Sequence, residues 1–352
     1  MKLLLVATPV GTLQSGQVGG VGLNICNIAK ELLNRGHDVT ILAPQGSQVD
    51  GLPIVEIAGE LQKSAPKQAR ESPIVIPPNG VITHLWDRAF QTQHQYEVIV
   101  NFAYDWLPLY VAPFFNTPVL HYVNMSSWLV AMEQVIDRVA ALKPGTLGVH
   151  TRAQAETFPN PAVFRILGGG IEVERYEFQP HPGSDLAWAG RISPEKGLED
   201  AIAAAAMTGK RLQIFGYIQD PDYWQTLQTQ YPNAELIYQG FLPTAQFQQA
   251  LGHCQALLMT HKWVEALGRV ALESLSCGVP IIAYRRGGPA EIIEDGVSGF
   301  LVEPDSIEGV TTAIANLSQL ERCHCRQRAE SEYSLAALGD RLERWMGDVL
   351  SA

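Results

Sequence analysis

Apolar runs of strand length alternate with stretches of helical periodicity along almost the whole chain, and this pattern constrains the fold more than any other feature. The run LLLVAT at 3–8 is followed by a glycine-rich loop, an amphipathic stretch at 21–35 and a second apolar run, DVTILAP, at 38–44. A strand, a helix and a strand in this order indicate a parallel sheet with helices on both faces. The sequence therefore predicts an α/β fold.

The alternation occurs as two series, which are separated by the glycine-rich segment VFRILGGG at 163–170. Because 352 residues exceed the size of an ordinary single core, two domains are expected. We predict two doubly wound halves that bind ligands at the carboxyl ends of their strands, with a cleft between them. Strands are expected at 53–57, 97–101, 118–123 and 146–149, then at 185–189, 211–216, 235–238, 255–259 and 279–284, and helices at 197–208, 221–230, 244–252, 267–276 and about 331–350.

The charge balance and the apolar stretches argue against two classes of partner. The chain carries 36 Asp and Glu against 25 Lys and Arg, a formal net charge of −11, whereas nucleic-acid binding needs clustered basic side chains. Residues 98–115 are apolar but are interrupted by polar residues and prolines, and a membrane span needs about 20 apolar residues. We expect a cytoplasmic protein with no nucleic-acid partner and no stable membrane association.

The five cysteines are scattered, which indicates free thiols in a reducing compartment. The run Cys323-His324-Cys325 has the wrong spacing for a zinc knuckle and no second pair follows, so no metal site is expected. The start of the chain, MKLLLVATPVG, lacks a small-residue cleavage site. We interpret it as a first strand and not as a signal peptide.

The loop GQVGGVG at 16–22, which contains Gly19 and Gly20, is the first segment that suggests chemistry. Glycine permits positive φ and close approach of a ligand to the backbone, and the helix N-terminus that follows attracts an anion. A tight turn between a strand and a helix would use the same residues. The spacing is not G-x-G-x-x-G and no acid ends the second strand, which disfavours a dinucleotide-dependent dehydrogenase.

The segment AWAGRISPEKGLED at 187–200 places Arg191 and Lys196 in a loop directly after a strand. Arginine offers a fork and lysine a point charge, and the pair suits a diphosphate. A solvated surface loop is the alternative, because the neighbouring acids at 195, 199 and 200 could pair with both cations.

The segment EALGRVALE at 265–273 is expected to start a helix, so the N–H groups of Ala266, Leu267, Gly268 and Arg269 would face an anion. Glu265 and Glu273 would stand about 12 Å apart along such a helix. Each carboxylate could then accept from a sugar hydroxyl on one side of a diphosphate. The alternatives are helix-dipole stabilisation by Glu265 and a buried Glu273 that is satisfied by backbone.

These segments, in this order, resemble the retaining glycosyltransferases of family 4, which have the GT-B fold. The most specific parts are GRISPEKG at 190–197, EALGRVALESLSCGVPIIA at 265–283 and GGPAEIIEDGVSGFLV at 287–302. The resemblance implies two facing Rossmann-like domains, with 1–168 binding the acceptor, 169–330 binding the nucleotide sugar, and a last helix at 331–352 crossing back to the first domain. It also implies transfer without a metal or another cofactor.

The resemblance further implies roles for single residues. Arg191 and Lys196 would hold the diphosphate, Glu273 would bind the ribose, and Glu265 would contact the transferred sugar without acting as a nucleophile. The backbone of 266–269 would meet the sugar and the phosphates, and Gly19 and Gly20 would lie near the donor phosphates. Many relatives have a histidine six residues after the proline that begins a strand. This chain has Asn124 there, which leaves a histidine role in doubt, although Asn124 could hydrogen-bond a sugar hydroxyl.

Acceptor contacts are expected from the first domain. The segment TPVGTLQSGQVGGVG at 8–22 and the compact length are similar to cyanobacterial enzymes that glucosylate tetrahydrobiopterin. A carboxylate can grip the guanidine-like edge of a pterin with two hydrogen bonds, so Asp105 joins Glu265 and Asn124 as a candidate catalytic residue. UDP-glucose is the default donor by resemblance. The candidate acceptor-binding residues are Thr8, Gly11, Ser15, Asn101, Tyr104, Asp105 and Trp106.

Three other functions remain open from the sequence. A transferase of lipid-linked or surface polysaccharide would need a basic or apolar patch on the first domain, and the charge count does not favour one. A nucleotide-sugar epimerase of the same two-domain shape would convert the donor without an acceptor. A non-catalytic nucleotide-binding module would bind the donor without turnover, and the presence of all the motifs argues against it.

Overall fold

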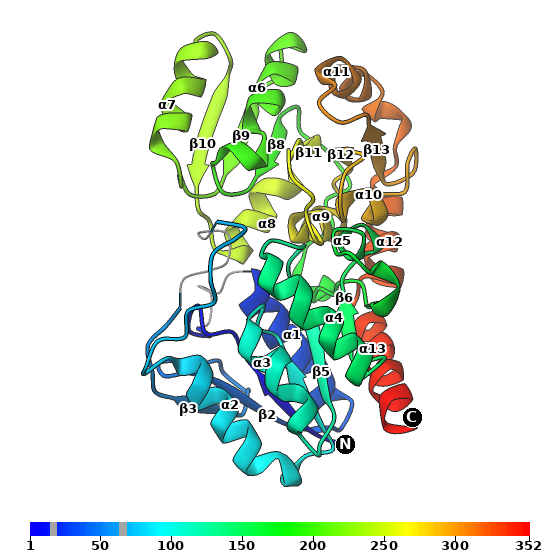
Figure 1. Cartoon of the computed structure of the whole chain (residues 1–352). Helices are drawn as coiled ribbons and strands as arrows, with labels where there is room; N and C mark the ends of the chain where they lie inside the picture. Colours follow the sequence, from blue (N-terminus) through cyan, green and yellow to red (C-terminus); the bar gives the residue numbers. More distant parts are fainter. Residues whose placement is uncertain (15–19, 63–68) are drawn as a thin grey trace. The chain divides into compact units, whose positions relative to one another are not determined.

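The computed structural model describes residues 1–14, 20–62 and 69–352, and the chain forms two compact units (Figure 1). Unit 1 comprises Met1–Gly170 together with Leu335–Ala352, and unit 2 comprises Ile171–Ser334. These limits lie close to the boundaries proposed from the sequence, 168/169 and 330/331. The binding roles assigned to the two domains, and the cleft expected between them, stay predictions.

Unit 1 is built around a seven-stranded parallel sheet with the order β3-β2-β1-β4-β5-β6-β7. Each strand except the last corresponds to an apolar run in the sequence. The strands are β1 (Lys2–Val6), β2 (Asp38–Pro44), β3 (Ile54–Ile57), β4 (Val98–Asn101), β5 (Val119–Val123), β6 (Leu147–Val149) and β7 (Arg165–Ile166).

Both faces of this sheet are covered, because successive residues of a strand point to opposite sides. Leu3 and Leu5 of β1 share a core with the helices α1 (Gly20–Asn34) and α13 (Leu335–Leu350). Leu4 and Val6 belong to a second core with α2 (Val81–Thr92). The other helices of unit 1 are α3 (Trp106–Val111), α4 (Val130–Leu142) and α5 (Arg152–Ala155).

Unit 2 repeats this architecture with a six-stranded parallel sheet of order β10-β9-β8-β11-β12-β13. The predicted α/β class is therefore confirmed in both units. The strands are β8 (Leu186–Ala189), β9 (Leu212–Phe215), β10 (Leu236–Gly240), β11 (Ala256–Met259), β12 (Ile281–Tyr284) and β13 (Gly299–Val302).

The faces of the second sheet are covered in the same way. Leu186 and Trp188 pack in a core with α6 (Leu198–Met207) and α11 (Ile307–Ala315), whereas Ala187 packs in a core with α9 (Arg269–Ser276) and α12 (Arg322–Glu332). The remaining helices are α7 (Pro221–Gln230), α8 (Thr244–Gly252) and α10 (Pro289–Ile292).

Strand order reverses once in each sheet, between β1 and β4 in unit 1 and between β8 and β11 in unit 2. Ligands of doubly wound sheets bind beside such a reversal, at the carboxyl ends of the strands. In unit 2 the loops that leave this point are 190–197 and 260–268, and in unit 1 they include 7–14 and 102–105. Each of these loops contains residues that the sequence analysis proposes as site residues.

Two expected helix limits are wrong. The helix expected at 267–276 begins at Arg269, because Gly268 before it has a φ of 80°, in the left-handed region. The helix expected at about 331–350 begins at Leu335, and a separate helix, α12, precedes it and ends at Glu332. The two helices are separated at residues 333–334, where the carbonyl of Tyr333 accepts a hydrogen bond of 2.9 Å from the N–H of Ile171.

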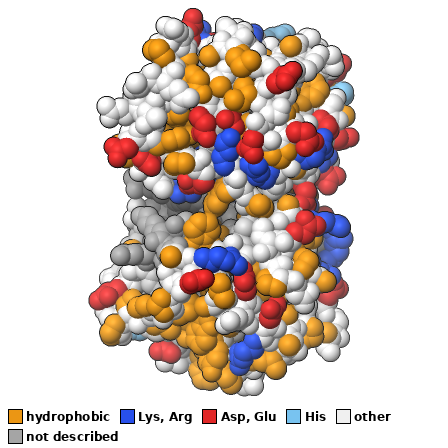
Figure 2. Space-filling model, turned by 45° about the horizontal axis from the view of Figure 1, so that its top comes forward, with side chains coloured by type: hydrophobic (Ala, Val, Ile, Leu, Met, Phe, Trp, Pro, Cys, Tyr) orange, Lys and Arg blue, Asp and Glu red, His pale blue; other side chains and the backbone are white. Residues whose placement is uncertain are grey.

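The described part of the chain contains no helix that is both long and apolar enough to cross a membrane. On the face drawn in Figure 2, Lys and Arg side chains lie interspersed with Asp and Glu side chains. This face therefore offers no continuous basic surface, which agrees with the net charge of −11.

Candidate active site

The candidate site in unit 2 is formed by the two loops that follow β8 and β11, which are neighbours in the sheet. The loops contact each other directly. The N–H of Lys262 donates to the carbonyl of Glu195 at 2.9 Å, and the Thr260 hydroxyl donates to the carbonyl of Gly197 at 2.6 Å. Gly197 has a φ of 64°, and a Cβ atom there would lie 2.0 Å from the carbonyl oxygen of Thr260. Only glycine permits this approach.

This contact brings together two nominated residues that are far apart in the sequence. Lys196 Nζ lies 2.5 Å from Glu265 Oε2, so the cation and the carboxylate form a hydrogen-bonded ion pair. Trp263 completes the group, because its indole N–H donates to the same Oε2 at 3.0 Å and its ring lies under Lys196 Nζ at 4.7 Å. Both donors meet Oε2, and Oε1 of Glu265 is left to accept from a ligand.

The ionised form of Glu265 is stabilised by these neighbours. Burial alone would raise the pKa of this carboxyl, but the Lys196 ammonium, His261 and the Trp263 N–H together lower its pKa below the usual value. The side chain remains about 20% exposed. Glu265 is thus an accessible carboxylate that stays charged at neutral pH.

Backbone N–H groups next to Glu265 are available to an anion. Ala266, Leu267 and Gly268 lie in a turn before α9, and the N–H groups of residues 267–270 have no acceptor in the part of the chain that the structure describes. In addition, Nε of Arg269 is buried without a partner there. The first N–H groups of a helix form an anion-binding site together with the helix dipole.

Arg191 lies in the same loop as Lys196 but makes different contacts. Its guanidinium donates to Gln219 Oε1 at 2.6 Å and lies 3.4 Å from Glu195 Oε1. The alternative raised from the sequence, pairing with a neighbouring acid, therefore holds in part for Arg191. Lys196 instead pairs with Glu265, 69 residues along the chain.

Glu273 differs from Glu265 in its electrostatics. Burial raises its pKa above the usual value, and the charge of Arg269 and a hydrogen bond from the Tyr176 hydroxyl, at 3.1 Å, offset this only in part. The simpler interpretation, a carboxyl satisfied by backbone, does not describe Glu273, because its hydrogen-bond partner is a tyrosine side chain. The two glutamates are not joined by one continuous helix, since α9 begins at Arg269.

In unit 1, Asn101 is 1% exposed and its amide is used within the unit. The amide nitrogen donates to the carbonyl of Ala103 at 3.0 Å and to Nδ1 of His121 at 3.1 Å, and the amide oxygen accepts from the N–H of Ala103 at 3.0 Å. The amide of Asn101 is therefore bonded within the unit, and its expected contact with an acceptor stays a prediction.

Asn124 is also held by its own unit. Its amide nitrogen donates to the carbonyls of Phe102, at 3.2 Å, and Tyr122, at 2.7 Å, and its oxygen accepts from the Asn24 amide at 3.3 Å. Both amide hydrogens are therefore committed to backbone. A sugar hydroxyl could meet only the remaining lone pair of the oxygen, as a donor.

Asp105 and the aromatic residues beside it form the start of α3. Asp105 is the N-cap of the helix, and its Oδ1 accepts from the N–H of Leu107 at 3.0 Å. Burial raises its pKa above the usual value. The Tyr104 hydroxyl accepts from the N–H of Trp128 at 3.1 Å, and Trp106 stacks on Tyr110 with a centroid distance of 4.3 Å. All three side chains are half-buried.

The remaining nominated residues surround the first turn of α1. Thr8 and Gly11 are half-buried in the loop after β1, and a Cβ atom at Gly11 would meet nothing within 4 Å. Gly20 is the exposed first residue of α1. Ser15 and Gly19 lie outside the described residues.

A group of possible metal ligands lies away from these loops. Side-chain atoms of Glu321, Cys323 and His324 come within 4.8 Å of one another at the start of α12. The third member is Glu321 and not Cys325, because Cys325 is buried and contacts the carbonyl of Ser298.

Two site residues were missed by the sequence interpretation. Trp263 contacts both Lys196 and Glu265, and a tryptophan two residues before the first glutamate of the motif was the available signal. His261 is buried, its Nε2 lies 2.8 Å from the carbonyl of Arg286, and its Nδ1 has no partner in the described part of the chain. Burial lowers the pKa of His261 below its usual value.

Comparison with known proteins bears on the family and the fold of the chain. Residues 178–332 match the model of the family described as glycosyl transferases group 1. The chain is 22% identical to glycogen synthase of Mycobacterium tuberculosis over 90% of this chain and 88% of that protein. Among solved structures, Anabaena HepE in complex with UDP and glucose has a TM-score of 0.72 at 18% identity and covers 99% of this chain and 100% of HepE. Sucrose-phosphate synthase from Thermosynechococcus elongatus has a TM-score of 0.74 at 16% identity, with 99% of each chain covered.

The two sheets and these structural neighbours establish the GT-B fold that the sequence predicted. The family match covers unit 2, which contains Lys196, Glu265 and Glu273. The chain is a transferase enzyme with the GT-B fold, and residues 178–332 are similar to glycosyl transferases group 1.

Proposed function

We propose that this enzyme transfers a hexose, glucose, from UDP-glucose to a small acceptor with retention of the anomeric configuration. One observation carries the proposal: the accessible carboxylate of Glu265 is paired with Lys196, directly beside backbone N–H groups that have no acceptor among the described residues. This arrangement suits a ligand in which a neutral sugar adjoins a diphosphate. Similar solved structures support the choice of donor, because HepE was solved with UDP and with UDP-glucose.

In the proposed complex the N–H groups of 267–270, together with Lys196 and Arg191, neutralise the diphosphate. Oε1 of Glu265 accepts from a hydroxyl of the glucose, and Glu273 meets the ribose. The bond between the sugar C1 and the phosphate oxygen breaks, and a bond from C1 to the acceptor oxygen forms on the same face. The acceptor proton passes to the leaving phosphate oxygen, so no side chain needs to act as a base.

The acceptor that we propose is a pterin, on the basis of the similarity at 8–22 and of the carboxylate of Asp105. Oδ1 of Asp105 already accepts from Leu107, which leaves Oδ2 and one further lone pair for the guanidine-like edge. We propose also that transfer needs no divalent metal, since two cationic side chains and a helix N-terminus supply positive charge to the diphosphate.

The test is incubation of the enzyme with a panel of UDP- and GDP-sugars, each with and without tetrahydrobiopterin, followed by mass spectrometry. The proposal predicts one added hexose on the pterin and release of UDP from UDP-glucose alone among the donors, and NMR should show the α-anomer. An altered sugar nucleotide without acceptor would indicate an epimerase. Binding without turnover of any donor would indicate a non-catalytic module.

Asp105→Asn separates the pterin from other acceptors. The variant should lose pterin glucosylation while it keeps slow hydrolysis of UDP-glucose, because Asn replaces one acceptor oxygen by a donor. Undiminished turnover with the pterin would contradict the proposal that Asp105 binds the pterin.

A further inference from the structure

The candidate donor site depends on two irregular loops, and neither is held by a strand or an α-helix. Lys196 ends a short 3-10 turn, Pro194–Lys196, and Glu265 lies in the irregular segment between β11 and α9. Loops of this kind are fixed by contacts outside regular structure. The distance between Lys196 and Glu265 is therefore set by whatever fastens one loop to the other.

Lys262 makes contacts to both sides of this junction. Its backbone N–H donates to the carbonyl of Glu195, the residue before Lys196, at 2.9 Å. Its side chain points to carboxylates of other elements. It forms a hydrogen-bonded ion pair with Asp200 of α6, lies 3.2 Å from Asp305 in the loop after β13, and lies 3.9 Å from Glu199. Three acids thus surround one ammonium group.

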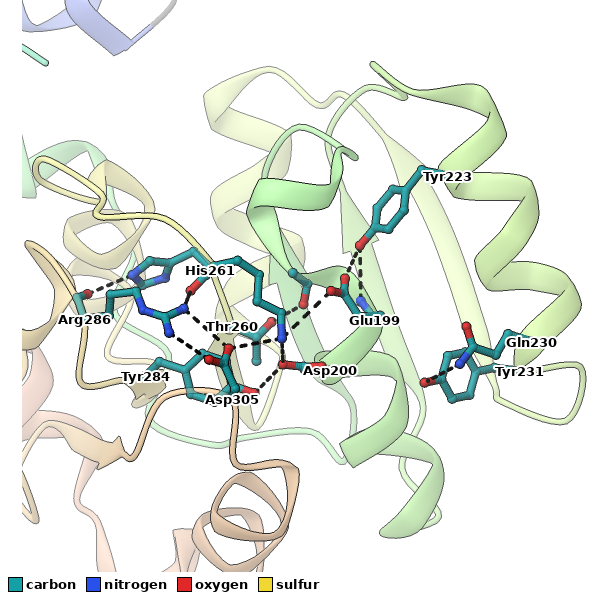
Figure 3. A network of polar contacts seen from close by, with 12 residues as sticks. Glu199, Asp200, Tyr223, Gln230, Tyr231, Thr260, His261, Tyr284, Arg286 and Asp305 are labelled. Carbon is teal, nitrogen blue, oxygen red and sulfur yellow. Dashed lines mark hydrogen bonds and ion pairs between the residues drawn. The ribbon is translucent and has the colours of Figure 1, made fainter. Parts of the chain in front are cut away.

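The acids around Lys262 are themselves fixed by other elements. Figure 3 shows Asp200, Tyr284 and Asp305 meeting from α6, β12 and the loop after β13. The Tyr284 hydroxyl donates to Asp200 at 2.6 Å, and Arg286 donates to Asp305 at 2.8 Å. Arg286 also donates to the carbonyl of His261 at 3.0 Å, directly before Lys262.

The charges explain why this network needs its lysine. Asp200 is only 6% exposed, and Glu199 and Asp305 lie beside it. Without Lys262, Arg286 would be the one cation of the network near three carboxylates, and repulsion would separate the elements that carry them. Lys262 is three residues from Glu265, so such a separation would move Glu265 away from Lys196.

We propose that Lys262 is a positioning residue of the donor site: through Asp200 and Asp305 it anchors the loop that carries Glu265 against the loop that carries Lys196. Lys262 does not contact the donor in this assignment. The inference rests on the proposed function for its consequence in transfer, but the anchoring itself is a property of the ligand-free protein.

Two measurements on the full chain test the proposal, with Lys262→Met, Lys262→Arg and, as a matched control, Lys210→Met. Lys210 lies in the same unit, and its ammonium group makes no hydrogen bond or ion pair among the described residues. The first measurement is hydrogen exchange without ligand. Lys262→Met should exchange faster in peptides that span 193–198 and 260–266, Lys262→Arg should restore most of the protection, and Lys210→Met should match the parent protein.

The second measurement is steady-state transfer from UDP-glucose. Lys262→Met should lower kcat about 10- to 100-fold, the scale of a misplaced catalytic group, and Lys262→Arg should recover most of it at an unchanged melting temperature. Unchanged exchange in Lys262→Met, or loss of kcat that Lys262→Arg does not relieve at all, would overturn the proposal. If the parent enzyme transfers no hexose, the proposed function fails, and the exchange measurement alone decides on the anchoring.

Discussion

The two units have the same kind of sheet but use the polar side chains at their strand-order reversals differently. In unit 1 the amide of Asn101, at the end of β4, is bonded to Ala103 and His121 within the unit. In unit 2 the charged pair Lys196–Glu265 keeps a carboxylate oxygen and adjacent backbone N–H groups without partners in the described chain. The difference shows that a polar residue at a strand-order reversal indicates ligand binding only when the protein itself does not already use its hydrogen-bonding groups.

The largest effect should follow from changing the free carboxylate of unit 2. Glu265→Gln keeps the shape but removes the charge that pairs with Lys196, so kcat for hexose transfer should fall by about 10²-fold or more, as for a lost transition-state contact. Glu273→Gln is the control, and its loss should be clearly smaller, because burial already favours the neutral form of Glu273. Equal losses in steady-state assays would contradict the distinction between the two glutamates.

A second prediction concerns the committed amide of unit 1. Asn101→Ala leaves the N–H and the carbonyl of Ala103 without their partner, so the free energy of unfolding should fall by about 1–3 kcal/mol. The affinity for UDP, measured by calorimetry, should not change. Asn116→Ala is the control, since that residue is exposed and its side chain makes no hydrogen bond among the described residues. An unchanged urea midpoint for Asn101→Ala would show that its hydrogen bonds do not stabilise the unit.

A third prediction concerns the orientation of Glu265. Trp263→Phe removes the hydrogen bond to Oε2 and should lower kcat/KM about 10-fold, the scale of one hydrogen bond to a charged group. The N–H lowers the pKa of Glu265, so its loss should raise that pKa, and the acid limb of the pH profile should move to higher pH. Trp224→Phe is the control, since Trp224 lies in α7, where its ring packs against Tyr238 at a centroid distance of 5.5 Å. A pH profile that does not move would show that Trp263 does not influence the ionisation of Glu265.

The smallest effect is expected from metal removal. Treatment with EDTA should leave the rate of transfer unchanged, because Lys196, Arg191 and the N–H groups before and within α9 are proposed to supply the positive charge. Loss of activity that magnesium or manganese restores would contradict this proposal and would assign part of the charge compensation to a bound cation.

Much of the fold could be predicted because it rests on local periodicity. Apolar runs such as 3–8 and 38–44 correspond to β1 and β2, and the expected helix at 221–230 corresponds to α7, Pro221–Gln230. Helix limits were less certain. The start of α9 depends on the left-handed Gly268, whose Cβ position is blocked by Pro289, 21 residues later, at 2.7 Å. Local pattern does not contain that contact.

The candidate site was likewise predictable from the sequence only in part. Motifs nominated Lys196, Glu265 and Glu273, because cations and acids stand beside expected helix starts. The sequence analysis did not single out Trp263. It also did not show that Ala103 and His121 would occupy the hydrogen-bonding groups of Asn101. It also did not single out Lys262, whose partners Asp200 and Asp305 are 62 and 43 residues away.

The sequence by itself determined two parallel α/β units and the residue types available for binding a phosphorylated sugar, since hydrophobic periodicity and loop composition act over a few residues. Only the tertiary structure decided which of those residues are free. Hydrogen-bond capacity is consumed by partners that folding brings from distant segments, and the same folding sets the pKa of Glu265 below and that of Glu273 above their usual values.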